Sequence, residues 1–589
     1  MKRLMTGNEA IARGAYESGV RFASAYPGTP STEILENITQ YQEITAEWAP
    51  NEKVALEAAA GASLGGIRSL AAMKHVGVNV AADPLFTFVY TGVGGGMVLI
   101  SADEPGQHSS QNEQDNRYYA VAAKLPMFEP ANSQECKEML KTAYDLSEQY
   151  DTPVLLRTTT RVNHSKSIVD CNERSEHLYK PYQKNPAKNL MVPAFARKRR
   201  AVVEQRMQDL AEYTESCGFN VIEEGGSIGV VVAGVSYHYA KEIFGKTATY
   251  LKLGFTNPLP AKLLGSFAAQ VETIYVIEEN DPYLEDWIKA SGYECHGKDV
   301  FPAFGEMTPD VLRRALSYEE LPNIAYNQEL IVSRPPTLCA GCPHRGLFYE
   351  LGKKKNVAIS GDIGCYTLGY AAPYHAMDCC ICMGSAFSVG HGISQAADIT
   401  GQNLRVVGIM GDSTFFHTGI NSLTEVLYNG SRTICIILDN RITGMTGHQE
   451  NPGSGKLACG EPAHQMDIGS IVRAMGAKNV TEINPNNLKA VREALDTALA
   501  ADEASVIITK WPCVLKRMEA KERELYGNPF SGKYSVDNEK CINCQICIRC
   551  GCPAISINRA LCKAEVDASQ CVGCGVCAQI CPKQAVVAV

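Results

Sequence analysis

Ten of the chain's 23 cysteines lie in residues 541–589, at spacings that suit metal binding. The second half of this segment contains Cys571, Cys574, Cys577 and Cys581, followed by Pro582. Three thiolates on one tight loop can each reach a different iron of a cubane, and the fourth ligand then comes from elsewhere in the chain. The spacing therefore predicts [4Fe–4S] clusters. The alternative metal, zinc, favours paired CxxC units that close a tetrahedron.

The first half of the segment repeats this pattern with one cysteine more than a cluster needs. Cys541, Cys544 and Cys547 keep the spacing, and both Cys550 and Cys552 follow. A proline directly follows Cys552, as it does the last cysteine of the second half, so we take Cys552 as the fourth ligand. In two-cluster proteins the fourth cysteine of each repeat binds the cluster of the other repeat. The predicted ligand sets are Cys541, Cys544, Cys547 and Cys581 for one cluster and Cys571, Cys574, Cys577 and Cys552 for the other, with Cys550 and Cys562 left over.

Composition restricts the remaining function classes. The 589 residues carry a net charge of −9 with a pI of about 5.8, which argues against binding nucleic acid by neutralising its phosphates. We expect the one basic run, residues 197–200, to be a solvated linker face. The N-terminus lacks the apolar core of a signal peptide, and no apolar run reaches the ~18 residues of a membrane span. We therefore expect a cytoplasmic protein that binds neither nucleic acid nor membrane, with reduced cysteines that serve metal binding or catalysis.

A second group of candidate ligands lies in "MGDSTFFHTGINSLTEVLYNGSRTICIILDNRITG". The pattern predicts a strand ending at Gly411 and Asp412, a helix, and a second strand ending at Asp439 and Asn440. In a parallel βαβ unit both strand ends meet at one edge of the sheet, where ligands bind. A carboxylate and an amide oxygen beside a diphosphate suit Mg²⁺. The alternative is an ordinary crevice in which these two residues fall by chance.

This pair of strand ends resembles the signature of thiamine diphosphate enzymes, in which GDG is followed by NN at the next strand end. The resemblance implies Asp412 and Asn440 as Mg²⁺ ligands, with the backbone carbonyl of Ile442 as a third and with Gly411 and Ser413 beside the cofactor. Ser413 replaces the usual glycine and Asp439 the first asparagine. Both departures leave the ligand positions intact.

The predicted elements divide the chain into five parts. Alternating strand and helix patterns recur in three of them, which predicts α/β domains with parallel sheets. A polar, basic stretch separates the first two, and another polar stretch precedes the cysteine-rich tail. The parts are residues 1–165 (α/β), 166–225 (linker with one helix), 226–330 (a smaller α/β domain), 331–527 (α/β) and 528–589 (α+β, with two [4Fe–4S] clusters).

Further strings, spread over the whole chain, are similar to those of the 2-oxoacid:ferredoxin oxidoreductases, above all to the alpha subunits that act on indolepyruvate. The strings are "YPGTPSTE" (26–33), "NEKVALEAAAGAS" (51–63), "LCAGCPHRG" (338–346), "GDIGCYTLG" (361–369) and "GHQENPGSG" (447–455). The resemblance implies transketolase-like domains: a pyrimidine-side thiamine domain first, a transketolase C-terminal-like domain second and a diphosphate-side domain third. The tail would be a bacterial-type ferredoxin domain.

Carried over residue by residue, the resemblance implies Glu52 as the carboxyl that activates thiamine. A carboxyl buried among alanines and glycines can share a proton with the aminopyrimidine ring. Glu57 is its competitor, and an exposed helix glutamate is the alternative for either. Thr29 and Ser31 fall where the family contacts the oxoacid carboxylate, although a structural turn would use the same residues. Arg117 is a further candidate for pairing with that carboxylate, with a surface arginine as the alternative.

Four cysteines outside the tail match those that hold a third cluster next to thiamine in related enzymes. They are Cys339, Cys342, Cys365 and Cys513. Widely separated cysteines can also be small core residues, so both interpretations stay open. Cys379, Cys380 and Cys382 have no implied role, and we expect them to be buried.

The resemblance implies oxidative decarboxylation of aryl 2-oxoacids, indolepyruvate or phenylpyruvate, with the acyl group passed to coenzyme A and electrons passed to ferredoxin. Single-chain members carry an additional catalytic domain, for which we find no counterpart among these residues. A small beta subunit is therefore the expected partner, in an assembly of two alpha and two beta chains. The alternatives are another 2-oxoacid specificity, a non-oxidative thiamine decarboxylase and an electron-transfer subunit that has lost catalysis.

Overall fold

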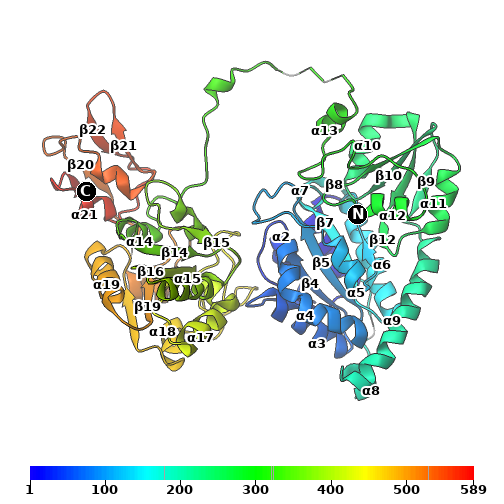
Figure 1. Cartoon of the computed structure of the whole chain (residues 1–589), viewed down its shortest axis with the longest axis horizontal. Helices are drawn as coiled ribbons and strands as arrows, with labels where there is room; N and C mark the ends of the chain where they lie inside the picture. The colour runs from blue at the N-terminus through cyan, green and yellow to red at the C-terminus, as the bar shows by residue number, and fades with distance from the viewer. Residues whose placement is uncertain (178, 320, 323, 528) are drawn as a thin grey trace. The chain divides into compact units, whose positions relative to one another are not determined.

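The computed structural model describes residues 1–589 except 178, 320, 323 and 528, and it divides into two compact units, residues 1–326 and 327–589 (Figure 1). Each unit is built around a mainly parallel sheet. This finding confirms the predicted α/β multidomain class. Residue 528, where the predicted tail domain begins, lies outside the described residues.

The first unit contains a seven-stranded sheet in the order β12-β6-β7-β5-β4-β2-β3, parallel at every pairing except that of β12 with β6. Apolar clusters lie on both faces of this sheet, which is why its central strands are nearly continuous apolar runs. The strands are β2 (Phe22–Ala25), β3 (Thr45–Trp48), β4 (Ser69–Lys74), β5 (Met97–Asp103), β6 (Met127–Phe128), β7 (Val154–Thr159) and β12 (Phe255–Asn257). The helices are α1 (Gly7–Glu17), α2 (Thr32–Ile38), α3 (Glu52–Leu64), α4 (His75–Thr91), α5 (Arg117–Ala123), α6 (Ser133–Tyr150) and α7 (Thr160–His164).

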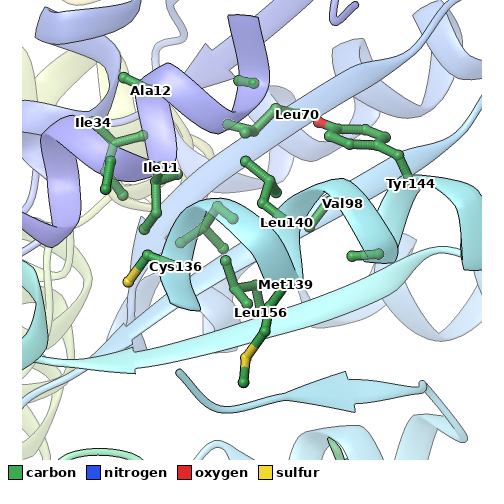
Figure 2. Close-up of a cluster of buried hydrophobic side chains, with 14 of the residues drawn as sticks. Ile11, Ala12, Ile34, Leu70, Val98, Cys136, Met139, Leu140, Tyr144 and Leu156 are labelled. Carbon is green, nitrogen blue, oxygen red and sulfur yellow. The ribbon is translucent and has the colours of Figure 1, made fainter. Parts of the chain in front are cut away.

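Helices α1 and α6 close one face of this sheet. Figure 2 shows Ile11 of α1 and Leu140 of α6 among the side chains that cover Leu70 and Val98 on the strands. A Cβ at Gly14 would lie only 3.2 Å from the Cδ2 of Leu140, so the two helices approach closely because this position is glycine.

Residues 166–225 are more integrated into the fold than the expected linker. Strand β8 (Lys166–Asp170) pairs with β1 (Lys2–Thr6), and the helices α8 (Pro186–Asn189) and α9 (Pro193–Thr214) follow. The basic run lies on α9, where Arg197, Lys198 and Arg200 are exposed as expected, and only Arg199 is half-buried. Arg199 donates to the backbone oxygen of Tyr90 (2.6 Å) and to Asp151 (2.8 Å). Carbonyls in the last turn of a helix lack intrahelical partners. Arg199 supplies a hydrogen-bond donor to one of them, the Tyr90 carbonyl in the last turn of α4.

A smaller sheet in the first unit has the order β13-β10-β11-β9, with β10 parallel to both neighbours and β9 antiparallel. Its elements are β9 (Val221–Glu223), β10 (Ile228–Ala233), α10 (Ser236–Phe244), β11 (Ala248–Leu253), α11 (Ala261–Ala268), β13 (Thr273–Ile277), α12 (Tyr283–Ala290) and α13 (Pro309–Ala315). Strand β12, in the same predicted part, instead joins the first sheet.

A buried ionic network joins these two sheets. Arg157 of β7 donates to Asp103 (2.7 Å), Glu129 (2.5 Å) and Asn280 (3.0 Å). Arg157 and its two carboxylate partners are almost fully buried. Because a buried charge is tolerated only when it is paired and hydrogen-bonded, this network fixes the smaller sheet against the larger one.

The second unit contains a fully parallel six-stranded sheet in the order β15-β14-β16-β17-β19-β18. Its strands are β14 (Val357–Gly361), β15 (Cys379–Cys380), β16 (Arg405–Gly411), β17 (Ile434–Asp439), β18 (Asn479–Ile483) and β19 (Ser505–Lys510). Its helices are α14 (His344–Leu351), α15 (Ala386–Thr400), α16 (Asp412–Thr414), α17 (Ile420–Tyr428), α18 (Ile468–Ala474), α19 (Leu488–Ala500) and α20 (Ala520–Tyr526). The βαβ unit β16–α17–β17 is the one that the sequence predicts.

The cysteine-rich tail consists of two small antiparallel strand pairs and two short helical turns. Strand β20 (Tyr534–Val536) pairs with β23 (Val586–Ala588), and β21 (Ile555–Asn558) pairs with β22 (Lys563–Val566). The turns are a 3₁₀ helix over Ile546–Cys550 and α21 (Val576–Ile580). Gln579 accepts from the amide of Leu488 (3.0 Å) and donates to the carbonyl of Asn486 (2.7 Å), which attaches the tail to the start of α19.

The network around Arg157 yields a stability prediction. Arg157→Met leaves Asp103 and Glu129 without their counter-ion, so we expect the free energy of unfolding to fall by about 3–5 kcal/mol. Arg161→Met is the matched control, because the Arg161 side chain is 52% exposed and its ion pair with Glu306 is worth less than about 1 kcal/mol. Urea unfolding of the full chain compares the two. Equal losses would contradict a structural role for the buried network.

Candidate functional site

Glu52 is the first residue of α3 and is only 6% exposed. A Cβ on Gly77 of α4 would lie 2.8 Å from the Oε1 of Glu52, so the absence of a side chain at Gly77 makes room for the carboxyl group. The competitor Glu57 is exposed and forms an ion pair with Lys53 (2.7 Å). Burial therefore favours Glu52 over Glu57 as the catalytic candidate.

The loop "YPGTPSTE" follows β2 and forms a tight turn. The Ser31 hydroxyl donates to the carbonyl of Gly28 (2.9 Å), and the Gly28 amide donates to the hydroxyl of Thr32 (2.9 Å). Ser31 is buried, whereas Thr29 is half-buried. Ser31 thus holds the turn in shape, and Thr29 is the better placed of the two to contact a substrate.

Lys74, which the sequence analysis missed, ends β4 beside this loop. Its Cδ lies 3.1 Å from where a Cβ on Gly28 would stand, its Nζ donates to the carbonyl of Ser109 (3.2 Å), and Glu104 lies 3.9 Å away. Burial lowers the pKa of Lys74, although the charges of Glu104 and Glu52 oppose the shift. Its position at the carboxyl end of a parallel strand, directly before a helix, is the signal that could have identified it.

The surroundings of Arg117 differ from those expected of a residue that pairs with a substrate carboxylate. Its guanidinium is 1% exposed and is occupied by Asp115 (2.9 Å), Glu278 (2.6 Å) and the carbonyl of Glu279 (2.9 Å). These partners use its donors within the junction between the two sheets of the first unit. Arg117 therefore belongs with the buried ionic network, and these contacts favour a structural role over substrate binding.

In the second unit, β16 and β17 end side by side as predicted, with Gly411 paired to Leu438. Asp412, Asn440 and Ile442 are all buried at this edge. Asp412 accepts from the amide of Ser413 (2.9 Å), and Asn440 accepts from the amide of Ile442 (3.2 Å). A π-helical turn over Phe415–Gly419 follows Asp412, a feature often found at functional sites.

Two residues that the sequence analysis missed support this edge. The Asn451 side chain, from the string "GHQENPGSG", donates to the Oδ2 of Asp412 (3.3 Å). Thr443 donates to the Ser413 hydroxyl (3.0 Å), which ties the two strand ends together. Neither contact could be predicted from spacing, because each depends on how a loop returns to the sheet.

The electrostatics of the edge favour a bound cation. Burial, and then the charge of Asp439, raises the pKa of Asp412 to about 7. Burial also raises the pKa of Asp439, and Arg441 at 3.4 Å opposes that shift. Two buried carboxylates at one edge repel each other unless a cation compensates them. The oxygen atoms present, from Asp412, Asn440 and the Ile442 carbonyl, are of the kind that Mg²⁺ prefers.

Asp362 is a further buried carboxylate that the sequence analysis did not single out. It accepts from the amides of Ile363 (2.8 Å), Gly384 (2.8 Å) and Ala386 (3.0 Å). Burial raises its pKa to about 6. It joins the "GDIGC" loop to the start of α15 and so shapes the same end of the sheet.

The candidates for a third cluster lie near one another. Burial is the main cause of the raised pKa of Cys342, and the charges of Cys365 and Cys513 add to it. The pKa of Cys365, raised to about 11, owes its shift first to burial and then to Cys513 and Cys339. A Cβ on Gly444 would lie 3.7 Å from the sulfur of Cys365 and 3.9 Å from the Nδ2 of Asn440, and the amide of Cys513 donates to the carbonyl of Asn440 (2.9 Å), so residues far apart in the sequence come together. Among the described residues no three Cys, His, Asp or Glu side chains converge as closely as a single ion requires, but a cubane holds its four thiolates at separate corners.

The tail cysteines line two cavities, and these follow the predicted sets. One cavity, with about 350 Å³ of space partly open to solvent, is lined by Cys541, Cys544, Cys547 and Cys581. The amide of Ala564 donates to the sulfur of Cys541 (3.5 Å), and the amide of Ala585 donates to that of Cys581 (3.2 Å). Hydrogen bonds to sulfur are a usual feature of iron–sulfur sites.

The other cavity, with about 400 Å³ of space, is lined by Cys571, Cys574 and Cys577 together with both Cys550 and Cys552. Cys550 is almost fully buried, and Cys552 is half-buried. The cavity thus offers five thiols for four positions. The donor chemistry fits a [4Fe–4S] cluster in each cavity, and the choice between Cys550 and Cys552 rests on the following proline.

The remaining cysteines differ from our expectation. Cys382 is exposed, and Cys379 and Cys380 are half-buried on the edge strand β15. An edge strand has a neighbour on one side only, so simple burial does not describe these residues. Cys562, left over in the tail, is also exposed.

The pKa of Asp412 yields a prediction for the metal. A carboxyl that is still half protonated near neutral pH must lose its proton before it can bind a cation. We therefore expect the affinity for Mg²⁺, in the presence of thiamine diphosphate, to rise between about pH 6 and about pH 8, with release of a proton. Calorimetry in two buffers of different ionisation enthalpy measures both quantities.

Two variants serve as comparisons for this measurement. Asp412→Asn removes the titrating ligand, so affinity should fall at least about tenfold and lose its pH dependence. Asp398→Asn changes an exposed carboxylate on α15 that pairs with Arg432 and should behave as the wild type. An affinity that does not change with pH in the wild type would contradict the prediction.

The cavity lined by Cys550, Cys552, Cys571, Cys574 and Cys577 yields a prediction for the ligand set. Cys552→Ser should lose the four irons of one cluster, because it removes a ligand, whereas Cys550→Ser and the exposed control Cys562→Ser should keep them. Iron and acid-labile sulfide analysis of anaerobically purified protein measures this. Loss of a cluster in Cys550→Ser but not in Cys552→Ser would show that the assignment is wrong.

Comparison with known families matches three parts of the chain. Residues 13–216 match the thiamine diphosphate-binding domain of pyruvate flavodoxin/ferredoxin oxidoreductases, residues 362–509 match the C-terminal TPP-binding domain of thiamine pyrophosphate enzymes, and residues 564–587 match a 4Fe-4S binding domain. Within the described part of the chain, no helix is long and apolar enough to cross a membrane.

Curated relatives match over nearly the full length. The chain is 39% identical to the indolepyruvate oxidoreductase subunit IorA of Archaeoglobus fulgidus and 40% identical to that of Methanothermobacter thermautotrophicus, in each case over 99% of this chain and 97% of the relative. A solved 2-oxoglutarate:ferredoxin oxidoreductase from Magnetococcus marinus aligns with 54% of this chain and 65% of its own, at 16% identity and a TM-score of 0.45. The chain therefore belongs to the family of IorA-type alpha subunits of indolepyruvate oxidoreductase, which are 2-oxoacid:ferredoxin oxidoreductases with thiamine- and [4Fe–4S]-binding domains.

Proposed function

We propose that this subunit oxidatively decarboxylates aryl 2-oxoacids, indolepyruvate and phenylpyruvate, to the aryl-acetyl-CoA and CO₂. Two electrons leave for an external ferredoxin. The cofactors would be thiamine diphosphate, Mg²⁺, the two tail clusters and a third cluster at Cys339, Cys342, Cys365 and Cys513. The aryl specificity rests on the names of the relatives.

One observation carries the proposal: the candidate Mg²⁺ ligands adjoin the candidate third-cluster cysteines. A Cβ on Gly444 would lie 3.7 Å from the sulfur of Cys365 and 3.9 Å from the Nδ2 of Asn440. The amide of Cys513 donates to the carbonyl of Asn440 (2.9 Å). A thiol set that contacts the diphosphate edge is suited to accepting electrons where a substrate is decarboxylated.

A second backbone contact fixes the "PC" string to the end of β17. The amide of Trp511 donates to the carbonyl of Asp439 (3.1 Å), and Cys513 follows two residues later. The position of the Cys513 backbone is therefore set by the same strand end that supplies Asn440.

The residues of this chain would divide the work as follows. Thiamine diphosphate, when bound, supplies the electron sink that allows a 2-oxoacid to lose CO₂. Asp412, Asn440 and the Ile442 carbonyl would hold the Mg²⁺ that binds its diphosphate. Glu52 would share a proton with its aminopyrimidine ring, and Thr29 would contact the substrate carboxylate.

The alternatives make different demands on the chain. A non-oxidative decarboxylase releases an aldehyde and needs neither the two cysteine-lined cavities nor the thiols beside Asn440. An electron-transfer subunit without catalysis needs neither the buried Glu52 nor the cation-binding edge at Asp412. The chain contains all of these features, which favours an oxidative enzyme.

A second subunit is part of the proposal. The relatives are named as subunits, which implies at least one further chain. We propose that the further chain is a small beta subunit and that two alpha chains assemble with two beta chains. Ferredoxin and coenzyme A would be the remaining partners.

An anaerobic assay of the alpha subunit with its beta partner tests the function. Reduction of ferredoxin or a dye is followed with indolepyruvate, phenylpyruvate, pyruvate and 2-oxoglutarate, each with and without coenzyme A. We expect the two aryl acids to be oxidised and the reaction to require coenzyme A for turnover.

Matched variants separate catalysis from electron transfer in this assay. Asp412→Ala should lose at least about a hundredfold in rate, because its metal site is broken, yet keep its tail clusters. Asp398→Ala should retain full activity. If no acid reduces the acceptor in the complete complex, the proposed function fails, and aldehyde release without acceptor reduction would favour the non-oxidative decarboxylase.

A further inference from the structure

Arg345 is a buried guanidinium with only neutral hydrogen-bond partners. It lies on α14 and is 1% exposed. Its donors go to the carbonyl of Cys339 (3.0 and 2.7 Å) and to the Tyr374 hydroxyl (2.6 Å), and further to the carbonyls of Leu338, Cys550 and Gly551. Among the described residues, no carboxylate forms an ion pair with it. A buried charge without a counter-ion is costly, so an anion is to be expected here.

The partners of Arg345 belong to two different cysteine sets. Cys339 begins the CxxC of the candidate third cluster, and Cys550 and Gly551 precede Cys552 in the tail. Tyr374 strengthens the link, since its hydroxyl also donates to the carbonyl of Cys550 (2.6 Å). The arginine thus holds two cysteine loops that are separated by about two hundred residues of sequence.

The two loops are also in direct contact. Gly341, inside the CxxC, has a φ of +69°, and a Cβ there would collide with a methyl group of Val572 in the tail. Gly341 and Arg345 both line the cavity that holds Cys571, Cys574 and Cys577. Only glycine permits so close an approach with this backbone conformation.

We propose that Arg345 is a positioning residue that serves as the shared counter-cation of two [4Fe–4S] clusters. One cluster would be held by Cys339, Cys342, Cys365 and Cys513, and the other by Cys571, Cys574, Cys577 and Cys552. A cluster ligated by four thiolates is an anion, which supplies the missing partner of the guanidinium. The added electron of a reduced cluster increases that negative charge, so Arg345 raises both reduction potentials. This inference rests on the cluster content given under the proposed function.

The test compares three variants of the full chain in complex with its beta subunit, purified anaerobically. Arg345→Met removes the charge, and Arg345→Lys keeps it with fewer hydrogen bonds. Arg492→Met is the matched control. Arg492 lies on α19, is 53% exposed and pairs with Glu350, which lies on α14 as Arg345 does. The readouts are iron and sulfide content and a potentiometric titration followed by electron paramagnetic resonance.

In Arg345→Met we expect the ratio of reduced to oxidised cluster at a fixed potential to fall about tenfold, which for a one-electron couple is about 59 mV towards more negative potential. Arg345→Lys should remain closer to the wild type than to Arg345→Met, and Arg492→Met should match the wild type. Arg345→Met with all its iron and wild-type potentials would overturn the proposal.

If Arg345→Met loses iron, Arg345→Lys decides the question. Retention of iron with near-wild-type potentials in Arg345→Lys supports the counter-cation, whereas loss of iron in both variants overturns it. Failure of the proposed function is distinguishable from these outcomes. Wild-type protein with four irons fewer would remove the third cluster from the proposed cofactors, and with it the sharing of Arg345 between two clusters. Absence of substrate oxidation would count against the proposed function alone, because it leaves the measured potentials unchanged.

Discussion

Charge balance at the end of β16 and β17 is the constraint on which the second unit depends. Asp412 and Asp439 end neighbouring strands, both are buried, and two such carboxylates cannot both stay ionised without cations nearby. Arg441 lies 3.4 Å from Asp439, whereas the hydrogen bonds to Asp412 come from two neutral amides, those of Ser413 and Asn451. Among the described residues no ion pair is formed by Asp412, which supports the Mg²⁺ site proposed for this edge.

Charge balance also distinguishes two buried arginines, Arg117 and Arg345. Arg117 and Arg345 are both about 1% exposed. Arg117 has two carboxylate partners, Asp115 and Glu278, so its charge is balanced within the protein and it fixes one sheet to another. Arg345 has carbonyls and a phenol, which satisfy its hydrogen bonds but not its charge. Hydrogen-bond counts alone would not distinguish these residues.

How much could be predicted from the sequence depended on how local the determining pattern was. The ends of β16 and β17 were predictable because a βαβ unit places consecutive strand ends at one edge, and the tail cavities follow cysteine spacing. The ionic partners of Arg117 were not predictable, because Glu278 lies 161 positions away. Lys74 and Asn451 were missed because their contacts depend on returning loops. Strand β12 is only three residues long and pairs with β6 of the first sheet, across a predicted domain boundary. This pairing could not be predicted, because no local sequence pattern encodes it.

The attachment of the tail distinguishes its two cysteine sets. The cavity of Cys571, Cys574 and Cys577 includes Gly341 and Arg345 from the preceding domain, whereas the cavity of Cys541, Cys544, Cys547 and Cys581 is lined by tail residues alone. Cys544, which lines the cavity formed by tail residues alone, is exposed. One set therefore faces the thiamine domain and the other faces outward. Under the proposed function, an external one-electron acceptor would meet the outward set first.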